Sequence, residues 1–318
     1  MEIAPLKGWV LDLVAHLDVA CPGFAGAYLR ASTERRQIIA AFMAAVRIGR
    51  EGEREAAAML VTADHRTILE HAFPTVPMGL RRALGKSGPQ PHEPAYYRDL
   101  HQALLSGQRQ VTAAIMQSPK LTPDRLAIIT ALPADLCDAR IVHRVEARAD
   151  AHDLTLVTSL LAERGIDRAE FIDALRRSTA PLKKVVQRWA LQIPFPPHPI
   201  PAAKGYRPIR DGRELRKVAL AYQNCSRRYT NASIVGENAF GEFTDDDSQT
   251  ALICLQKHED IWTLDGVYVR RNRQVAADLD KRAREFAARY GILERRYTTG
   301  SDDATAALKR FTRSVFDW

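Results

Sequence analysis

Hydrophobic side chains recur with helical spacing through the first 193 residues. Between residues 32 and 48, apolar positions are separated by three or four residues, which is typical of a helix with one buried face. In residues 121–132, Thr122 followed by Pro123 is a common signal for the start of a helix. No strand-like alternation of useful length interrupts these segments. The pattern therefore predicts a helical domain over residues 1–193.

Prolines crowd the next segment, residues 194–208, which contains six of them. Proline fixes φ and disfavours helical conformation in the residue before it, so this segment must be extended or irregular. We interpret it as a semi-rigid linker between two domains. The alternative interpretation is a proline-rich ligand for another protein.

The hydrophobic pattern changes after the linker and predicts a small α+β domain over residues 209–318. Residues 250–256 and 260–266 are rich in β-branched and aromatic side chains and predict a hairpin. Residues 267–272 predict a third strand, whereas the polar stretch 236–249 predicts a loop. Helices are expected over residues 211–229, 274–291 and 300–316. The predicted fold class is mainly α, with a helical N-terminal domain followed by a small α+β C-terminal domain that contains a short antiparallel sheet.

Cys225 lies within the apolar seam of the helix expected over residues 211–229. The seam consists of Leu215, Val218, Tyr222, Cys225 and Tyr229, which are spaced by three or four residues. A thiol in apolar surroundings has a raised pKa and is inert, so we expect Cys225 to contribute to core packing. The alternative is a catalytic nucleophile that the distant His258 assists.

The four cysteines show none of the paired spacings that mark disulfide frameworks or structural zinc sites, which favours a reducing cytoplasm. The successive carboxylates at 245–247 lack the alternate spacing of a calcium loop, so a solvated loop is favoured over a divalent-metal site. Nucleotide-binding and serine-hydrolase motifs are missing as well. The sequence therefore predicts no metal and no cofactor, and it gives no positive case for an enzyme.

Long apolar runs are also missing from the chain, and its first residues lack the cationic leader of a secretory signal. We therefore expect no membrane partner and a cytoplasmic, bacterial protein.

The charge of the chain points to a polyanionic partner, DNA or RNA. The formal net charge is +8 and the pI is near 9.4. Cations gather opposite the apolar seam and again at the end of the last predicted strand. The residues predicted to bind nucleic acid are Arg213, Arg216, Lys217, Asn224, Arg227, Arg228, Arg270, Arg271, Asn272 and Arg273. Guanidinium and amide groups suit phosphate and base contacts. The alternative is a solvated helix face in a protein whose arginine content reflects a GC-rich genome.

Cations of the helix expected over residues 274–291 are predicted to extend this surface. They are Lys281, Arg282, Arg284 and Arg289. Acidic side chains on the same helix, Asp278, Asp280 and Glu285, would neutralise part of their charge.

The segment from Gly212 to Asn272 resembles the PcfJ-like family. The resemblance rests on a helix that starts near a glycine, a cysteine followed by a tyrosine four positions later, a strand pair, and an asparagine flanked by arginine. In this sequence these elements are Gly212, Leu215, Asn224, Cys225, Tyr229, the strands around Leu255 and Trp262, and Asn272. Asn224 stands where the family usually has histidine, and Val269, Arg270 and Arg271 replace a glycine-rich approach. The resemblance implies association with plasmids, phages or conjugative elements and supplies no catalytic mechanism.

Three functional hypotheses follow from the sequence. The leading one is a nucleic-acid-binding accessory factor of a mobile genetic element or of its control. The second is a scaffold whose helical domain or proline-rich linker engages a protein partner. The third is a nucleic-acid-processing enzyme that uses Cys225 with His258, or the carboxylates at 245–247 with a metal ion.

Overall fold

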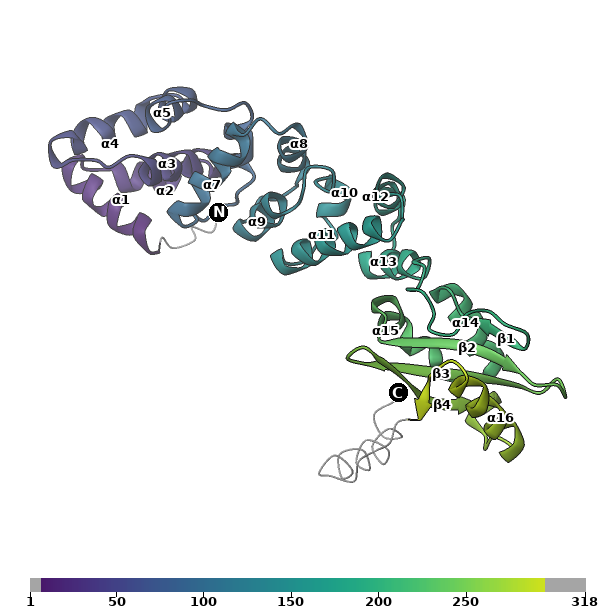
Figure 1. Ribbon diagram of the computed structural model, residues 1–318. Helices are drawn as coiled ribbons and strands as arrows, with labels where there is room; N and C mark the ends of the chain where they lie inside the picture. Colours follow the sequence, from purple (N-terminus) through teal and green to yellow (C-terminus); the bar gives the residue numbers. More distant parts are fainter. Residues whose placement is uncertain (1–6, 295–318) are drawn as a thin grey trace, which may run out of the picture. The chain divides into compact units, whose positions relative to one another are not determined.

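The computed structural model describes residues 7–294 of the chain, so the helix predicted over residues 300–316 lies outside the described residues (Figure 1). The fold is mainly helical, as predicted, with sixteen α-helices in the described residues and a small sheet in the C-terminal part. Contacts divide the chain into two compact units. The first runs to Glu163 and includes residues 167–186, and the second comprises residues 164–166 and the chain from Gln187 onward.

The N-terminal unit is built from helices alone. They are α1 (Trp9–Ala20), α2 (Phe24–Arg30), α3 (Thr33–Ala45), the 3-10 turn η1 (Arg50–Gly52), α4 (Glu53–Thr62), α5 (His65–Ala72), α6 (Leu80–Gly85), α7 (Pro94–Leu105), α8 (Arg109–Gln117), α9 (Pro123–Ala131), α10 (Ala139–Val142), α11 (Arg148–Glu163) and α12 (Arg168–Arg177). The division between the two units falls within α13 (Leu182–Ala190).

Side-chain caps mark the starts of three helices, and the start predicted at Thr122 is confirmed. Ser32 Oγ accepts a hydrogen bond from the backbone N–H three residues later in the chain. The side chains of Thr122 and Asp167 accept the equivalent hydrogen bonds at the starts of α9 and α12. Such caps satisfy backbone N–H groups that a helix leaves without partners at its first turn. The apolar face predicted for α3 is also confirmed, because Ile38, Ile39 and Phe42 are all buried.

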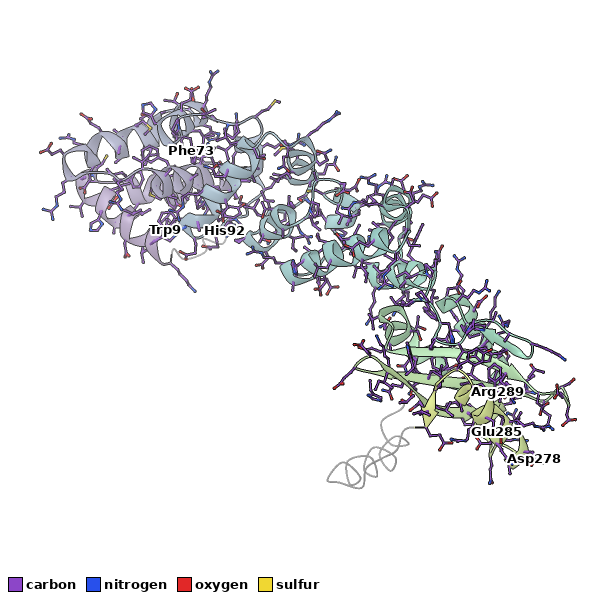
Figure 2. All side chains as sticks on the ribbon, viewed as in Figure 1. Trp9, Phe73, His92, Asp278, Glu285 and Arg289 are labelled. Carbon is purple, nitrogen blue, oxygen red and sulfur yellow. The ribbon has the colours of Figure 1, made fainter. Side chains whose placement is uncertain are left out.

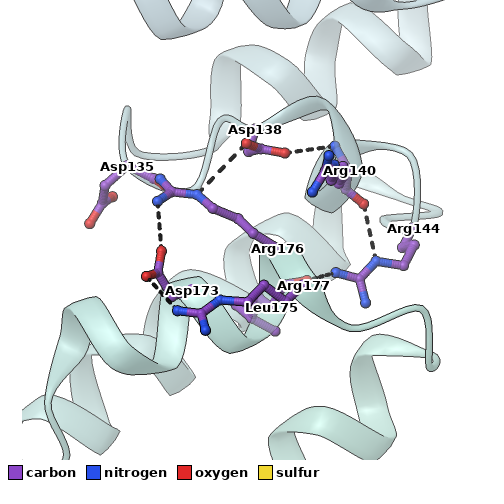
Figure 3. Close-up of polar contacts among 8 residues, drawn as sticks. All are labelled: Asp135, Asp138, Arg140, Arg144, Asp173, Leu175, Arg176 and Arg177. Carbon is purple, nitrogen blue, oxygen red and sulfur yellow. Dashed lines mark hydrogen bonds and ion pairs between the residues drawn. The ribbon is translucent and has the colours of Figure 1, made fainter.

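Arginines in the N-terminal unit hold the fold together (Figure 3). Arg176 on α12 forms an ion pair with Asp173, at 3.2 Å, and with Asp138 before α10, at 3.7 Å. Arg144 donates hydrogen bonds to the backbone carbonyls of Leu175 and Ala180, and burial lowers its pKa. The guanidinium groups of Arg144 and Arg176 use their N–H donors in contacts within the protein, so few donors remain for a binding partner.

The C-terminal unit surrounds a sheet of five strands. Its elements are β1 (Tyr206–Pro208), α14 (Gly212–Tyr222), η2 (Ser226–Tyr229), α15 (Thr230–Val235), β2 (Asn238–Thr244), β3 (Thr250–His258), β4 (Ile261–Tyr268), η3 (Arg270–Asn272), α16 (Ala277–Ala288) and β5 (Leu293–Glu294). The strand order follows the sequence, β1-β2-β3-β4-β5. The first four strands pair antiparallel, but β5 runs parallel to β4, so the sheet is mixed.

Two of the sequence predictions for this unit were wrong, one for a loop and one for a strand. The stretch 236–249 is not a loop throughout, because β2 occupies residues 238–244 inside it. Its polar Asn238 and its glycine concealed the strand. Gly241 is required there, since a Cβ would come within 2.1 Å of the Tyr206 hydroxyl that crosses over it. Residues 260–266 and 267–272 do not form two strands; β4 runs continuously through Gly266 and ends at Tyr268.

The proline-rich segment is packed into the C-terminal unit, which differs from the linker interpretation. Ile200 is fully buried in the core between the sheet and α16. The backbone N–H of Phe195 donates to the carbonyl of Arg210 at 2.7 Å, and Pro194 bridges to Asp211. Its prolines make the segment extended, as predicted, but its apolar side chains find partners on the sheet.

Helices cover both faces of the sheet, which Figure 1 shows as α14 and α15 on one side and α16 on the other. Along β3, Ile253 and Leu255 pack towards α16, whereas Leu252 and Cys254 pack towards α14. This alternation follows from the two-residue period of a strand. The unit therefore has three layers, and each face of the sheet has its own hydrophobic core.

Candidate nucleic-acid interface

Cys225 is not in a helix and is not buried, so the prediction of a core thiol was wrong. Helix α14 ends at Tyr222, and Gln223 adopts a left-handed conformation with φ 52°. Asn224 then accepts hydrogen bonds on its Oδ1 from the backbone N–H and the hydroxyl of Ser226, at 3.1 and 2.7 Å. Asparagine side chains compete with helix formation in this way. The turn ends the apolar seam early, and Cys225 is exposed to solvent.

Two segments that are distant in sequence meet at this turn. In η3, Arg271 and Asn272 both have positive φ, 63° and 48°. The Nε of Arg271 donates a hydrogen bond to Oε1 of Gln223 at 2.6 Å. Consecutive left-handed residues other than glycine are uncommon and cost energy, which the surrounding contacts must offset. The hydrogen bond fixes the arginine-rich turn η3 beside the end of α14.

The structure brings most of the predicted cations to this side of the sheet. Arg213, Arg216 and Lys217 lie on the exposed face of α14, opposite Leu215 and Val218. The others lie on or beside the two 3-10 turns: Asn224, Arg227, Arg228, Arg270, Arg271, Asn272 and Arg273. Arg213 is the outlier, because it lies in the first turn of α14, about 15 Å along the helix from Gln223.

Six of these cations form no ion pair with any described residue. They are Arg213, Arg216, Lys217, Arg227, Arg270 and Arg273, and all are exposed. Exposed, uncompensated guanidinium and ammonium groups on one surface create a positive potential that attracts polyanions. We call this set, together with Arg228 and Arg271, the α14 cation surface.

The cations of α16 do not join that surface, which differs from the sequence expectation. They lie on the opposite face of the sheet, where Figure 2 labels Asp278, Glu285 and Arg289 along the helix. Arg282 forms ion pairs with Asp245 and Asp247, each at 2.8 Å. Arg284 pairs in the same way with Asp280 and Glu294 on this side of the sheet.

A pocket of about 420 Å³ opens between the sheet and the two 3-10 turns of the α14 side. Its buried lining consists of Phe240, Leu252 and Cys254, which belong to the hydrophobic core beneath α14. The rings of Tyr229 and Tyr268 pack against the same core, and Tyr229 lies 5.8 Å from Phe240 between ring centroids. The interior of the pocket is therefore apolar and aromatic.

Polar side chains surround the mouth of this pocket. They are Asn224, Cys225, Arg228, Asp265 and Asn272, with Ser226 more deeply placed. Asp265 is the extra residue of a β-bulge, because Cys254 pairs with Gly266 and the next residue of β3 pairs with Leu264. Bulges reorient side chains and are frequent next to functional sites. Here the bulge places a carboxylate beside the arginine and amide groups of the turns.

The pocket contains two thiols but no imidazole from the described residues. Burial raises the pKa of the Cys254 thiol well above its ordinary value. His258 lies four residues further along β3, roughly 13 Å from Cys254 at the rise of an extended strand. His258 is also absent from the lining of the pocket that contains Cys225, so the Cys225–His258 pair considered as catalytic groups is not assembled there.

The carboxylates at 245–247 do not form a metal centre either. Asp245 is buried and accepts a hydrogen bond from the backbone N–H of Gln249 at 2.8 Å, in addition to its ion pair with Arg282. No cluster of three or more His, Cys, Asp or Glu side chains within residues 7–294 is arranged to hold a metal ion.

Several residues of the site were missed by sequence reasoning. Gln223, Asp265 and Tyr268 were not selected as functional candidates, although they position or line the pocket. The Asp265–Gly266 pair inside a strand pattern is a known signal for a bulge. Nothing in the sequence pattern indicates that the helix would end before Gln223 or that the side chain of Gln223 would accept a hydrogen bond from Arg271.

None of the described helices combines the length and the apolar composition that a membrane span requires. None of the comparisons with known proteins gave a match: no family model, no curated protein and no solved structure is significantly similar to the chain.

Proposed function

We propose that the protein binds nucleic acid through the α14 cation surface. The observation that carries the proposal is the meeting of two arginine-rich segments, 48 residues apart, through the hydrogen bond between Arg271 and Gln223. Cations that lack internal counter-charges can neutralise phosphates without first breaking ion pairs. Phosphate contacts release counterions from the nucleic acid, and this release supplies much of the binding free energy.

The proposed biological role is that of an accessory factor of a mobile genetic element or of its control. This part of the proposal rests on the resemblance of residues 212–272 to the PcfJ-like family. The proposal is limited to binding; it assigns no reaction to Cys225, which shares its pocket with no histidine of the described residues.

The proposal is tested with the variant R216A/K217A/R227A/R270A. These four side chains are exposed and have no ion pair within the described residues, so their removal should leave the thermal midpoint of unfolding unchanged. Affinity for a DNA or RNA oligonucleotide, measured by fluorescence anisotropy, should fall. The slope of log K against log salt concentration should decrease by about three to four, since each lost phosphate contact removes roughly 0.9.

The matched control removes four exposed cations elsewhere, R54A/R109A/K281A/R289A. It changes the net charge by the same amount, so an equal loss of affinity in both variants would show that only total charge matters. Unchanged affinity in the first variant would contradict the proposal.

A second candidate function, a protein-interaction scaffold, is favoured by a groove in the N-terminal unit. Side chains of α11 and α13 line this groove of about 720 Å³, including Leu154, Val157, Leu182 and Val186. Apolar concave surfaces of this size suit an amphipathic partner segment. Co-purification of a stable partner whose retention is lost on Val157→Asp, without retention on nucleic acid, would support this function.

A further inference from the structure

We propose that the pocket on the α14 side of the sheet receives a single unpaired base of the bound strand, and that it prefers a base with an exocyclic amino group. This inference deepens the proposed nucleic-acid binding and depends on it. It adds a substrate class, single-stranded or locally unpaired nucleic acid, which a positive surface alone does not select.

The location of the pocket supports a base rather than a phosphate. Arg228 and Asn272 belong both to the pocket and to the turns that carry the α14 cation surface. A strand whose phosphates contact those turns therefore passes over the mouth of the pocket. Its bases are then within reach of an apolar cavity of about 420 Å³, a size typical of small-molecule sites.

The lining has the chemistry of a stacking site. Tyr229, Phe240 and Tyr268 supply aromatic surface, and Leu252 closes the interior. Every base has a π face, so stacking on aromatic side chains stabilises single strands by about 1–3 kcal/mol per base. A base within a duplex is already stacked and paired, and it would have to leave the helix to enter such a pocket.

Hydrogen-bonding groups at the mouth are positioned to contact the edge of that base. The Oδ1 of Asn224 is engaged by Ser226, whereas its amide nitrogen forms no hydrogen bond with the described residues. The side-chain amide of Asn272 likewise makes no hydrogen bond within residues 7–294. Both amides can therefore donate to an acceptor on the base.

Asp265 provides the preference among bases. Its Oδ2 accepts a long hydrogen bond of 3.5 Å from the hydroxyl of Tyr268, and the carboxylate also interacts with the buried Cys254 thiol, so it lies exposed at the mouth with acceptor capacity left for a ligand. Carboxylates accept hydrogen bonds from exocyclic amino groups such as N4 of cytosine. Thymine and uracil present a carbonyl oxygen at the corresponding position, and an oxygen placed against a carboxylate is repelled.

Cys225 gives a direct readout of occupancy because it is exposed and lines the pocket. Alkylation by iodoacetamide is followed at each cysteine by mass spectrometry on the whole protein. Saturating oligodeoxycytidine should slow alkylation of Cys225 about tenfold, and a blunt duplex of the same sequence should leave the rate unchanged. Cytidine 5′-monophosphate at millimolar concentration should protect Cys225 more than uridine 5′-monophosphate does.

Two variants make the inference falsifiable at the level of single groups. Asp265→Asn should reduce the preference for oligodeoxycytidine over oligodeoxythymidine at least fivefold. The matched control is Asp260→Asn, the same chemical change on the turn between β3 and β4, where the side chain is fully exposed. Asn272→Gly retains the left-handed backbone and removes the amide, so it should weaken single-strand binding without lowering the thermal midpoint.

The outcomes separate this inference from the proposed function. If anisotropy detects no binding to any nucleic acid, the proposed function fails and the inference fails with it. If oligonucleotides bind but alkylation of Cys225 is equally fast with and without them, the base pocket is contradicted while the α14 cation surface stands. Equal protection by duplex and single strand would also contradict the base pocket.

Discussion

The two faces of the C-terminal sheet carry arginines in opposite states. On the α16 face, Arg282 and Arg284 are each held by two carboxylates. On the α14 face, Arg216 and Arg227 are exposed and have no counter-ion among the described residues. The same residue type therefore serves the fold on one face and remains available for a ligand on the other.

This contrast shows why net charge alone is a poor guide to a binding site. The carboxylates that neutralise the α16 face come from the helix itself, at i,i+4 spacing for Asp280 and Arg284, and from the loop after β2. A net charge calculated from composition includes these arginines, although their ion pairs within the protein already neutralise them. What distinguishes the α14 face is that six of its cations have no ion-pair partner among the described residues.

The largest expected effect concerns the core beneath α16. Leu255 is fully buried there, and Leu255→Ala should lower the free energy of unfolding by about 3 kcal/mol through lost burial and the cavity that remains. Urea denaturation measures this change. The exposed Leu220 on α14 is the matched control, and Leu220→Ala should change stability by less than about 0.5 kcal/mol. Equal effects would contradict the assignment of the core.

A smaller loss of stability is expected when the α16 face loses one of its cations. Arg282→Ala leaves the buried carboxylate of Asp245 without its ion-pair partner, so the thermal midpoint should fall. Arg289→Ala on the same helix removes an exposed cation and should leave the midpoint unchanged. The double variant R282A/D245A should recover part of the loss. A fall of equal size for Arg289→Ala would show that ion pairing does not distinguish these arginines.

Acidification should destabilise the C-terminal unit through His198. Burial holds the pKa of His198 below its ordinary value, because the charged imidazolium would lose its hydration in the interior. The unfolded chain binds the proton more readily, so stability is complete above the ordinary histidine pKa and declines as pH falls through it. His198→Asn should flatten this part of the stability profile between about pH 7 and 5. An unchanged pH dependence of stability in this variant would contradict the role assigned to His198.

The smallest expected effect on stability concerns the two cysteines of the α14 face. Cys225 is exposed and Cys254 is buried with a raised thiol pKa, so alkylating reagents should modify Cys225 and leave Cys254 intact in the folded protein. Cys225→Ser should not change the thermal midpoint. Protection of Cys225 in the free protein would restore the sequence-based expectation of a core thiol.

Sequence patterns predicted the helices better than the sheet for a physical reason. Helix α3 shows its buried face in Ile38 and Phe42, and its cap in Ser32, all within one short segment. Strand β2 lacks such local evidence. Its Gly241 is required because the ring of Tyr206, 35 residues earlier in the chain, leaves no space for a Cβ. Long-range packing thus determined the element that the local pattern concealed.

The candidate site was predictable in its cations but not in its pocket. The arginines stand out in the sequence, and their convergence was predicted correctly for α14 and the turn η3. The exposure of Cys225 was not predicted, because it depends on the hydrogen bond that the Ser226 hydroxyl donates to the side chain of Asn224. The bulge at Asp265 likewise arises from strand register, which hydrophobic alternation does not specify.

Cross-linking tests most directly the proposal that nucleic acid binds at the α14 cation surface. Ultraviolet irradiation of the protein with a single-stranded oligonucleotide, followed by mass spectrometry of the cross-linked peptides, should give adducts between residues 223 and 229 and between 265 and 273. Tyrosines in those segments, Tyr229 and Tyr268, are the expected sites. Adducts concentrated on α16 or in the N-terminal unit would contradict the proposed interface.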